Sequence, residues 1–189
     1  MCGRYIANSE DEIMEIREIL KQISLRLADV PSALSEIFPT HEVMFIHAAG
    51  VGIISQAKGK FGLEKWDKKG VIINARSETY ESNFFRQFAK NRCIIPAHGY
   101  YEWQKTEDKT KIKYAISCNE KHGIFMAGIY NKNNEFAIIT KPAEPEIAFI
   151  HHRMPLIVAA ENVSDWLGGR MQVRELAGKM SGLVWKEAG

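Results

Sequence analysis

The second residue of the chain is a cysteine, and its position gives it a chemistry that no other residue type offers. Removal of the initiator Met1 would leave Cys2 with a free α-amine and a thiol on adjacent carbons. The α-amine has a reference pKa of about 7.7–8.0 and the thiol of about 8.5, so both are partly nucleophilic at neutral pH. The amine can attack an aldehyde to give a Schiff base. The neighbouring thiol can then close a five-membered thiazolidine ring.

A structural role for Cys2 is the simpler alternative. Free cysteine is among the most buried residue types and behaves as a small hydrophobic side chain, here at the start of an expected strand. Position alone favours this structural role. The reactive role therefore depends on what other residues the chain supplies.

A carboxylate flanked by large aromatic residues is the second candidate. Glu102 lies between Tyr101 and Trp103. An apolar setting raises the pKa of a carboxyl group and allows it to serve as a general acid. A surface glutamate on an alternating strand is the structural interpretation of the same pattern.

Two further segments place polar side chains where a strand ends or a turn begins. Residues 74–79, which read Asn-Ala-Arg-Ser-Glu-Thr, close an apolar strand, and part of this cluster would also suit a helix cap. His151 and His152 precede an Arg-Met-Pro sequence. Adjacent side chains of an extended segment point in opposite directions, so at most one of these histidines is expected to face a site. A structural histidine is the alternative interpretation.

The composition is ordinary for a globular protein, with 46% hydrophobic residues, 25% charged residues and a net charge of +2 over 189 residues. A weak net charge means that any anionic partner must bind a local patch. Cys2, Cys93 and Cys118 are an odd number of well-separated cysteines without a CxxC pair, which disfavours disulfides and structural zinc and fits a reducing cytosol. Secretion and membrane spanning are disfavoured as well. We therefore expect a cytoplasmic protein, nucleoid-associated in a bacterium, without metal, cofactor, membrane contact or obligate protein partner.

The expected elements are mostly short strands. Ser9 precedes Glu12 by three residues, which is the capping-box pattern, and apolar residues then recur at helical spacing: Ile13, Ile16, Leu20, Ile23 and Leu27. Runs rich in β-branched and aromatic residues predict strands over residues 2–7, 42–47, 51–55, 71–74, 93–95, 100–104, 113–118, 124–130, 135–140, 156–159 and near 183–185. Further helices are expected over residues 80–90, 163–167 and 173–180.

This pattern predicts a single α+β domain over residues 1–189, with a mostly antiparallel, barrel-like sheet and a few peripheral helices. Residues 58–70 are expected to form a basic, glycine-rich loop that carries Phe61 and Trp66. Cys2 and Arg4 occupy alternate positions, so on a strand they would share one face.

Four separated segments, residues 1–5, 74–79, 92–103 and 151–155, together resemble the SRAP (SOS-response-associated peptidase) family. The resemblance spreads over nearly the whole chain. It implies a protein that binds single-stranded DNA and cross-links to abasic sites through the N-terminal cysteine, forming a stable thiazolidine that shields the lesion in the DNA damage response. Removal of Met1, as a possible autocatalytic step, would expose Cys2. This matches the chemistry argued above for an N-terminal aminothiol.

The resemblance also implies roles for single residues. Glu102 matches the active-site glutamate and would move protons during ring opening and loss of water. His151 matches the catalytic histidine and would shuttle protons at the sugar and in reversal. Asn74 matches an asparagine that orients Cys2 and the opened sugar. Arg4 is a cationic neighbour that would lower the pKa of the amine.

The expected DNA contacts come from the same comparison. Arginine side chains suit phosphates and aromatic side chains among lysines suit stacked bases. Where the family usually has Trp-Gly-Leu, this chain has Phe61-Gly62-Leu63. The matching positions are Arg4, Arg76 and Arg153 for phosphates, Phe61 and Trp66 for bases, and Pro39, Thr40 and Thr140 along the DNA channel.

Two alternatives remain open from the sequence. Cys2 and His151 could form a nucleophile–base pair in a cysteine-type peptidase that acts on other proteins. The chain could also be a non-catalytic single-strand binding module. Such a module would bind intact and abasic DNA equally, in a salt-sensitive way.

Overall fold

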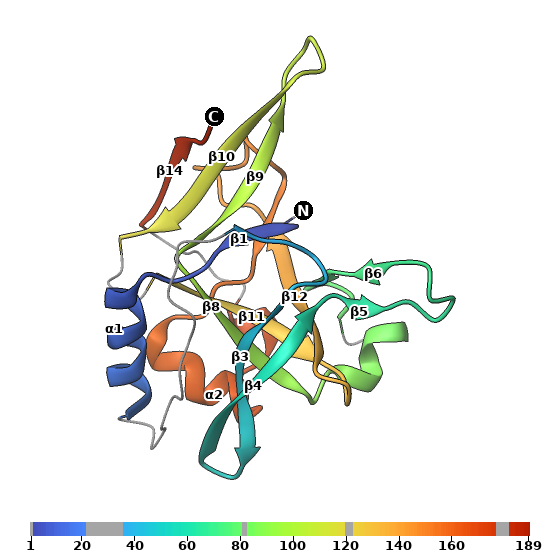
Figure 1. The fold of residues 1–189 in the computed structure, drawn as a ribbon, viewed down its shortest axis with the longest axis vertical. Coiled ribbons are helices and arrows are strands. Elements are labelled where there is room, and N and C mark those ends of the chain that lie inside the picture. The colour runs from blue at the N-terminus through green and yellow to red at the C-terminus, as the bar shows by residue number, and fades with distance from the viewer. Residues whose placement is uncertain (1, 22–35, 81–82, 120–122, 177–181) are drawn as a thin grey trace.

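Two sheets and a small hairpin make up most of the fold (Figure 1). The structure is a computed structural model, and it describes residues 2–21, 36–80, 83–119, 123–176 and 182–189. Every strand pair of the first sheet is antiparallel. This sheet has the order β14–β10–β9–β1–β2, with β1 (Arg4–Ile6), β2 (Glu36–Ile37), β9 (Gly99–Lys105), β10 (Lys111–Cys118) and β14 (Leu183–Glu187).

The second sheet closes on itself. Its strands run in the order β11–β8–β3–β4–β12, and β12 pairs again with β11 to complete a barrel. Only the pairs of β12 with β4 and with β7 are parallel. The predicted α+β class with a mostly antiparallel, barrel-like sheet is confirmed. The sheet comprises β3 (Glu42–Gly50), β4 (Ile53–Phe61), β7 (Asn74–Arg76), β8 (Arg92–Ala97), β11 (Ile124–Tyr130), β12 (Glu135–Pro142) and β13 (Arg153–Pro155).

Strand β12 is the hub of this sheet. Along its length it pairs with β4, β11, β7 and β13. Its side chains from Glu135 to Lys141 are all buried, and the strand is correspondingly rich in isoleucine and other apolar residues. β12 thereby aligns two segments that carry candidate site residues, β7 with Asn74 and β13 with Arg153.

The helices are short and peripheral. The helix predicted over residues 163–167 is confirmed as α2 (Val163–Leu167), whereas residues 80–90 contain a 3-10 helix, η1 (Asn83–Phe88). Ile23, Leu27 and the end of the helix predicted over 173–180 lie outside the described residues. Within the described part of the chain, no helix has the length and apolar character needed to cross a membrane. The other helices are α1 (Glu10–Lys21), η2 (Ala160–Asn162) and α3 (Val173–Leu176).

The predicted capping box opens α1. The Ser9 main-chain N–H donates to Glu12 Oε2 at 2.8 Å, and the Glu12 N–H donates to Ser9 Oγ at 3.3 Å. Glu12 Oε1 also lies 2.8 Å from Nδ1 of His98, at the turn between β8 and β9. The first turn of the helix is therefore tied to the sheet that carries Glu102.

Two sequence-based assignments are wrong in detail. Residues 58–70 are not one loop. The first four belong to β4, and the others include β5 (Leu63–Glu64) and the turn that leads to its hairpin partner, β6 (Val71–Ile72). The strand expected over 156–159 is instead β13, slightly earlier in the chain. Leu156 and Val158 follow it in a buried extended segment that bonds to both β11 and β12.

We predict that replacing the cap residue Ser9 by alanine lowers the free energy of unfolding by about 1 kcal/mol, because an N–H at the start of α1 loses its acceptor. Urea unfolding followed by circular dichroism measures the change. Met14→Ala, on the exposed side of the same helix, is the matched control and should stay within about 0.5 kcal/mol of the parent. Equal losses in the two variants would contradict the cap assignment.

Candidate active site

Cys2 lies just before β1, at the place where that strand pairs with β9. The register joins Arg4 to Tyr101 and Tyr5 to Tyr100, which draws the start of the chain toward Glu102. The Cys2 side chain is fully buried, with Sγ 3.9 Å from the main-chain oxygen of Arg4. Burial raises the pKa of the Cys2 thiol, and the negative charge of Glu102 raises it further, so the thiol is protonated at neutral pH.

Glu102 is buried on the inner face of β9, with 3% of its surface exposed. Burial raises the pKa of its carboxyl group, so this group can hold and release a proton in a pH range unusual for glutamate. The register of β1 with β9 brings Cys2 toward Glu102, and the charge of Glu102 acts on the Cys2 thiol. The surface-glutamate interpretation is wrong for this residue.

Asn74 completes the surroundings of Cys2 from the other sheet. Its Nδ2 atom donates to the main-chain oxygen of Cys2 at 3.1 Å. Its Oδ1 atom is buried and has no hydrogen-bond partner among the described residues. β7 brings it there by pairing in parallel with β12, with Asn74 opposite Ile138. Asn74 therefore fixes the Cys2 backbone through Nδ2, and its Oδ1 atom can accept a hydrogen bond from a ligand.

Tyr100 is a site residue that the sequence analysis missed. It is buried, and burial together with the charges of Cys2 and Glu102 raises the pKa of its phenol. Its hydroxyl has no partner in the described part of the structure. The available signal was its position two residues before Glu102, because side chains two apart on a strand share a face.

The two histidines lie together rather than on opposite sides. Their rings stack with centroids 4.4 Å apart, because they precede β13 in a turn instead of an extended segment. The prediction that only one would face a site is therefore wrong. Burial lowers the pKa of His151, and the charge of His151 lowers the pKa of the exposed His152. His152 also interacts with Glu102 and favours its charged form.

The His151 ring is oriented by the main chain of Arg153. The Arg153 N–H donates to Nδ1 of His151 at 3.0 Å, and the Arg153 carbonyl oxygen lies 3.2 Å from the same atom. Since a backbone N–H can only donate, Nδ1 acts as the acceptor and the proton of the neutral ring sits on Nε2. Nε2 is thus the atom that carries the transferable proton.

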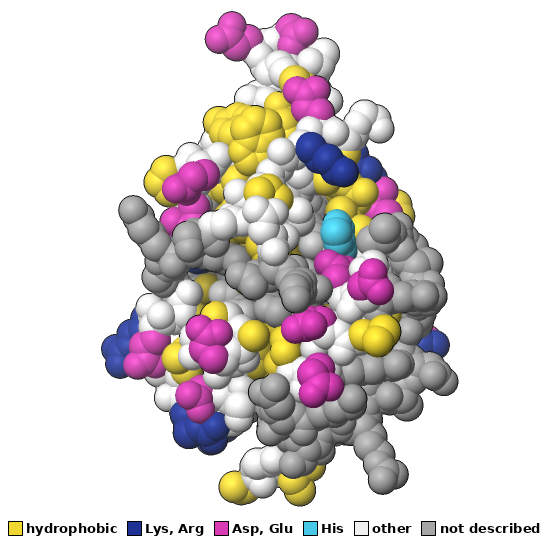
Figure 2. Space-filling model, turned by 90° about the vertical axis from the view of Figure 1, so that its left-hand side faces the viewer, with side chains coloured by type: hydrophobic (Ala, Val, Ile, Leu, Met, Phe, Trp, Pro, Cys, Tyr) yellow, Lys and Arg dark blue, Asp and Glu magenta, His cyan; other side chains and the backbone are white. Residues whose placement is uncertain are grey.

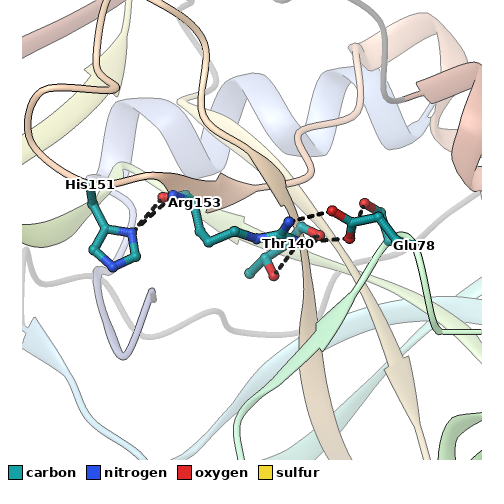
Figure 3. Close-up of polar contacts among 5 residues, drawn as sticks. Glu78, Thr140, His151 and Arg153 are labelled. Carbon is teal, nitrogen blue, oxygen red and sulfur yellow. Dashed lines mark hydrogen bonds and ion pairs between the residues drawn. The ribbon is translucent and has the colours of Figure 1, made fainter.

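The Arg153 side chain forms an ion pair with the carboxylate of Glu78. Its Nη1 and Nη2 atoms donate to the two oxygens of Glu78 at 2.5 and 3.0 Å, and Nη2 also donates to the main-chain oxygen of Thr140 at 2.6 Å (Figure 3). The hydrogen bonds from Arg153 lower the pKa of Glu78 to about 2. A phosphate would have to displace Glu78 from this fork. Thr140 is fully buried and contacts Arg153, so its expected place along a DNA channel is wrong for this arrangement.

Arg4 does not share a face with Cys2, which corrects the expectation from alternation. Strand β1 begins only at Arg4, so the alternation does not extend back to Cys2. The Arg4 guanidinium lies 4.5 Å from the ring centroid of Phe38 and 5.0 Å from that of Trp103, and it pairs with Glu36 at 3.3 Å. This ion pair reduces its effect on the amine of residue 2.

The remaining predicted DNA contacts separate into exposed and buried positions. Phe61 is fully buried and stacks on Phe136 at 5.4 Å, so the prediction that it stacks on a base is wrong. Trp66 is 89% exposed in the turn between β5 and β6, which projects from the body of the protein in Figure 1. Arg76, at the end of β7, is also exposed, as is Thr40, with Pro39 half-buried before it.

The described part of the chain holds no group of three or more His, Cys, Asp or Glu side chains arranged to bind a metal ion.

Comparison with known proteins identifies the family. The model of the family described as SOS response associated peptidase (SRAP) matches residues 1–185. The chain belongs to the SRAP family. Among curated SRAP relatives, the abasic site processing protein YoqW of Bacillus subtilis is 31% identical over 188 residues, covering 88% of this chain and 80% of its own length. The abasic site processing protein YedK of Escherichia coli is 33% identical over 123 residues, covering 60% and 52%.

Solved structures share the fold. A phage-related protein from Bordetella bronchiseptica superposes with a TM-score of 0.76 at 20% identity, covering 99% of this chain and 94% of its own. A protein from Bacteroides thetaiotaomicron gives 0.76 at 22% identity, covering 98% and 91%. At these identities the likeness establishes the architecture of the SRAP chain alone.

We predict that Glu102→Gln increases the rate at which iodoacetamide alkylates Cys2 at pH 8–9. Removing a negative charge lowers the pKa of the thiol, so a larger fraction is thiolate at any given pH. Peptide mass spectrometry after timed labelling measures the rate. Cys93 is an internal control because burial alone raises its pKa, and its rate should not change. An unchanged Cys2 rate would place Glu102 outside the electrostatic reach of the thiol.

Proposed function

We propose that this protein binds single-stranded DNA and forms a covalent thiazolidine cross-link between Cys2 and abasic sites, once Met1 has been removed. The cross-link shields the lesion in the DNA damage response. The proposal is supported by the names of the relatives, which are abasic site processing proteins. The DNA, the covalent product and the exposure of Cys2 are the finer steps that experiment must test.

The observation that carries the proposal is the meeting of Cys2, Asn74 and Glu102. Asn74 Nδ2 donates to the Cys2 carbonyl oxygen at 3.1 Å, and the buried carboxyl group of Glu102 interacts electrostatically with the thiol. An aminothiol that must condense with an aldehyde needs one group to orient it and another to move protons. These are the two functions that Asn74 and Glu102 supply.

The proposed reaction is a condensation that releases one water molecule. The free amine of Cys2 adds to the aldehyde carbon of the opened sugar, and a proton moves to the former aldehyde oxygen. Protonated Glu102 then donates to the departing hydroxyl as water leaves, giving an iminium ion. The thiol sulfur adds to the iminium carbon and its proton passes to the Glu102 carboxylate, which leaves the nitrogen as the neutral ring amine.

His151 serves the sugar side of the reaction in this proposal. Its proton sits on Nε2, and burial keeps the ring neutral at physiological pH, so it can donate one proton during ring opening. In reversal it would accept that proton back. Glu102 thus transfers protons at the departing hydroxyl and the thiol, whereas His151 transfers a proton at the sugar during ring opening.

The DNA is proposed to approach along the half-buried Arg4 and the exposed Arg76 and Trp66, with Pro39 and Thr40 following Phe38, whose ring lies under the Arg4 guanidinium. The face shown in Figure 2 is a poor alternative, because acidic side chains are scattered across its described part and the basic ones lie mainly toward its edges. Phosphates avoid such a surface. Trp66 provides a stacking surface at the tip of the β5–β6 hairpin.

A general cysteine peptidase is the weaker candidate. Proteolysis of other proteins requires a thiol with a lowered pKa in a partly exposed, electropositive setting. Cys2 has the opposite properties, since it is fully buried and both burial and Glu102 raise the pKa of its thiol. Peptide-bond chemistry is therefore proposed only for the Met1–Cys2 bond, as a possible autocatalytic step.

We predict that Cys2→Ala and Cys2→Ser each abolish the stable adduct on an abasic single-stranded oligonucleotide and leave only an imine that borohydride can trap. Alanine retains the amine but lacks the thiol, so its imine also fails to survive denaturation without reductant. Intact-mass spectrometry detects each product. Acetylating the α-amine, or retaining Met1, should abolish the adduct although the thiol remains.

The matched control is an oligonucleotide with a tetrahydrofuran in place of the abasic sugar, which has no aldehyde and should give no adduct. Equal, salt-sensitive binding to intact and abasic DNA without any adduct would identify a non-covalent binding module. Cleavage of a protein substrate without a DNA adduct would identify a peptidase. Either result would overturn the proposal.

A second prediction concerns rates. Glu102→Gln should slow cross-linking about 10²-fold, the lower range for losing general acid–base catalysis. Asn74→Ala should slow it about tenfold, equivalent to about 1.4 kcal/mol of lost hydrogen bonding. Single-turnover gels measure both. Rates within twofold of the parent protein for both variants would contradict the assigned roles.

A further inference from the structure

The contact between Glu78 and Arg153 has no part in the chemistry described so far. Glu78 follows β7, in the same segment as Asn74, and its side chain is 48% exposed, whereas the Arg153 side chain is only 8% exposed. The pair spans two elements that both attach to β12. It is bidentate, which is the strongest arrangement for an arginine and a carboxylate.

This ion pair is continuous with the hydrogen bond that orients His151. Figure 3 shows the Arg153 side chain extending to Glu78 and Thr140 while its main chain turns back to the His151 ring. Arg153 is held at the far end of its side chain by Glu78 and Thr140, and its backbone lies opposite β12, where the Ala143 N–H donates to the carbonyl oxygen of the preceding residue, His152. The N–H that fixes the His151 tautomer is thereby held in place from both ends.

From this geometry we propose that Glu78 is a positioning residue for proton transfer by His151, acting through Arg153. The inference rests on the proposed function for its catalytic consequence, but the orientation of His151 can be tested without DNA. Glu78 does two things: it fixes the main-chain donor that holds Nδ1 as an acceptor, and it neutralises a cation close to the imidazole.

The electrostatic part has a definite sign. The charged groups that act on His151 or its neighbour His152 are the α-amine at the start of the chain, Arg153 from β13, Lys105 and Glu102 from β9, and Arg76 from β7. Among them, the Arg153 charge disfavours protonation of His151. Glu78 offsets that charge, so its removal lowers the pKa of His151 further.

The test compares the parent protein with Glu78→Gln, which preserves size and removes the charge. Nitrogen-15 NMR titration of the histidine rings reports the tautomer and pKa of His151 in the free protein. We expect E78Q to lower that pKa and to add the Nδ1–H tautomer to the population. With abasic single-stranded DNA, we expect cross-linking near pH 7 to slow about tenfold. The limb of the pH–rate profile due to His151 should move to lower pH.

The controls separate this role from simpler ones. Glu161→Gln removes an equivalent charge from an exposed site in η2 and should change neither the titration nor the rate. Glu78→Asp keeps the charge but shortens the reach, so the rate should fall while the pH limb stays in place. In an Arg153→Lys background, adding E78Q should have little further effect, because Glu78 acts on His151 only through the Arg153 side chain.

Three results would overturn the inference. An unchanged His151 titration in E78Q would remove its basis directly. A slower reaction without movement of the pH limb would indicate a general structural loss, which melting curves would reveal. Tighter binding of intact single-stranded DNA by E78Q, with an unchanged limb, would mean that Glu78 competes with phosphate for Arg153. A parent protein that forms no adduct would instead overturn the proposed function and leave the NMR test standing.

Discussion

The antiparallel pairing of β1 with β9 is the interaction on which the rest of the site depends. β1 has only three residues, yet its register brings the start of the chain beside Glu102 and Tyr100. Because Cys2, just before this strand, is buried in the interior, its thiol has no contact with water and remains protonated. One short strand therefore sets both the position and the ionisation state of the reactive residue.

The side chains around Cys2 share a preference for their neutral forms. Burial raises the pKa of the Glu102 carboxyl and of the Cys2 thiol, and it lowers the pKa of His151. The effect is the same in each case, since low-dielectric surroundings disfavour charge. Such a site can pass protons among its own groups without first creating isolated ions, which suits a condensation that begins and ends with neutral organic groups.

Much of the fold and part of the site could be predicted from the sequence, because the signals involved are local. The capping box of α1, the bounds of β11 and the buried setting of Glu102 depend on spacing over a few residues. Contacts between distant segments could not be predicted in the same way. Phe61 is equally compatible with a surface or a core position, and its packing on Phe136, from β12, decides the matter.

The partners of the arginines and histidines could not be predicted from the sequence for the same reason. A sequence indicates that Arg4 and Arg153 are cationic, but it does not reveal that they form ion pairs with Glu36 and Glu78. The stacking of His151 on His152 depends on a turn whose shape is set by the strand that follows it. The sequence therefore gives the chemical character of these side chains, but it does not give the residues with which they form ion pairs or stack.

Strand β12, with its four partners, has a consequence for how the protein meets its ligand. A strand bonded along both edges cannot change register without breaking the barrel, so Asn74, through β7, and Arg153, through β13, have fixed spacing before any ligand arrives. The polar groups of such a preorganised site need little rearrangement as charge develops. Under the proposed function, adaptation to the irregular shape of a single DNA strand falls to peripheral parts such as the β5–β6 hairpin, while the chemistry takes place in the interior.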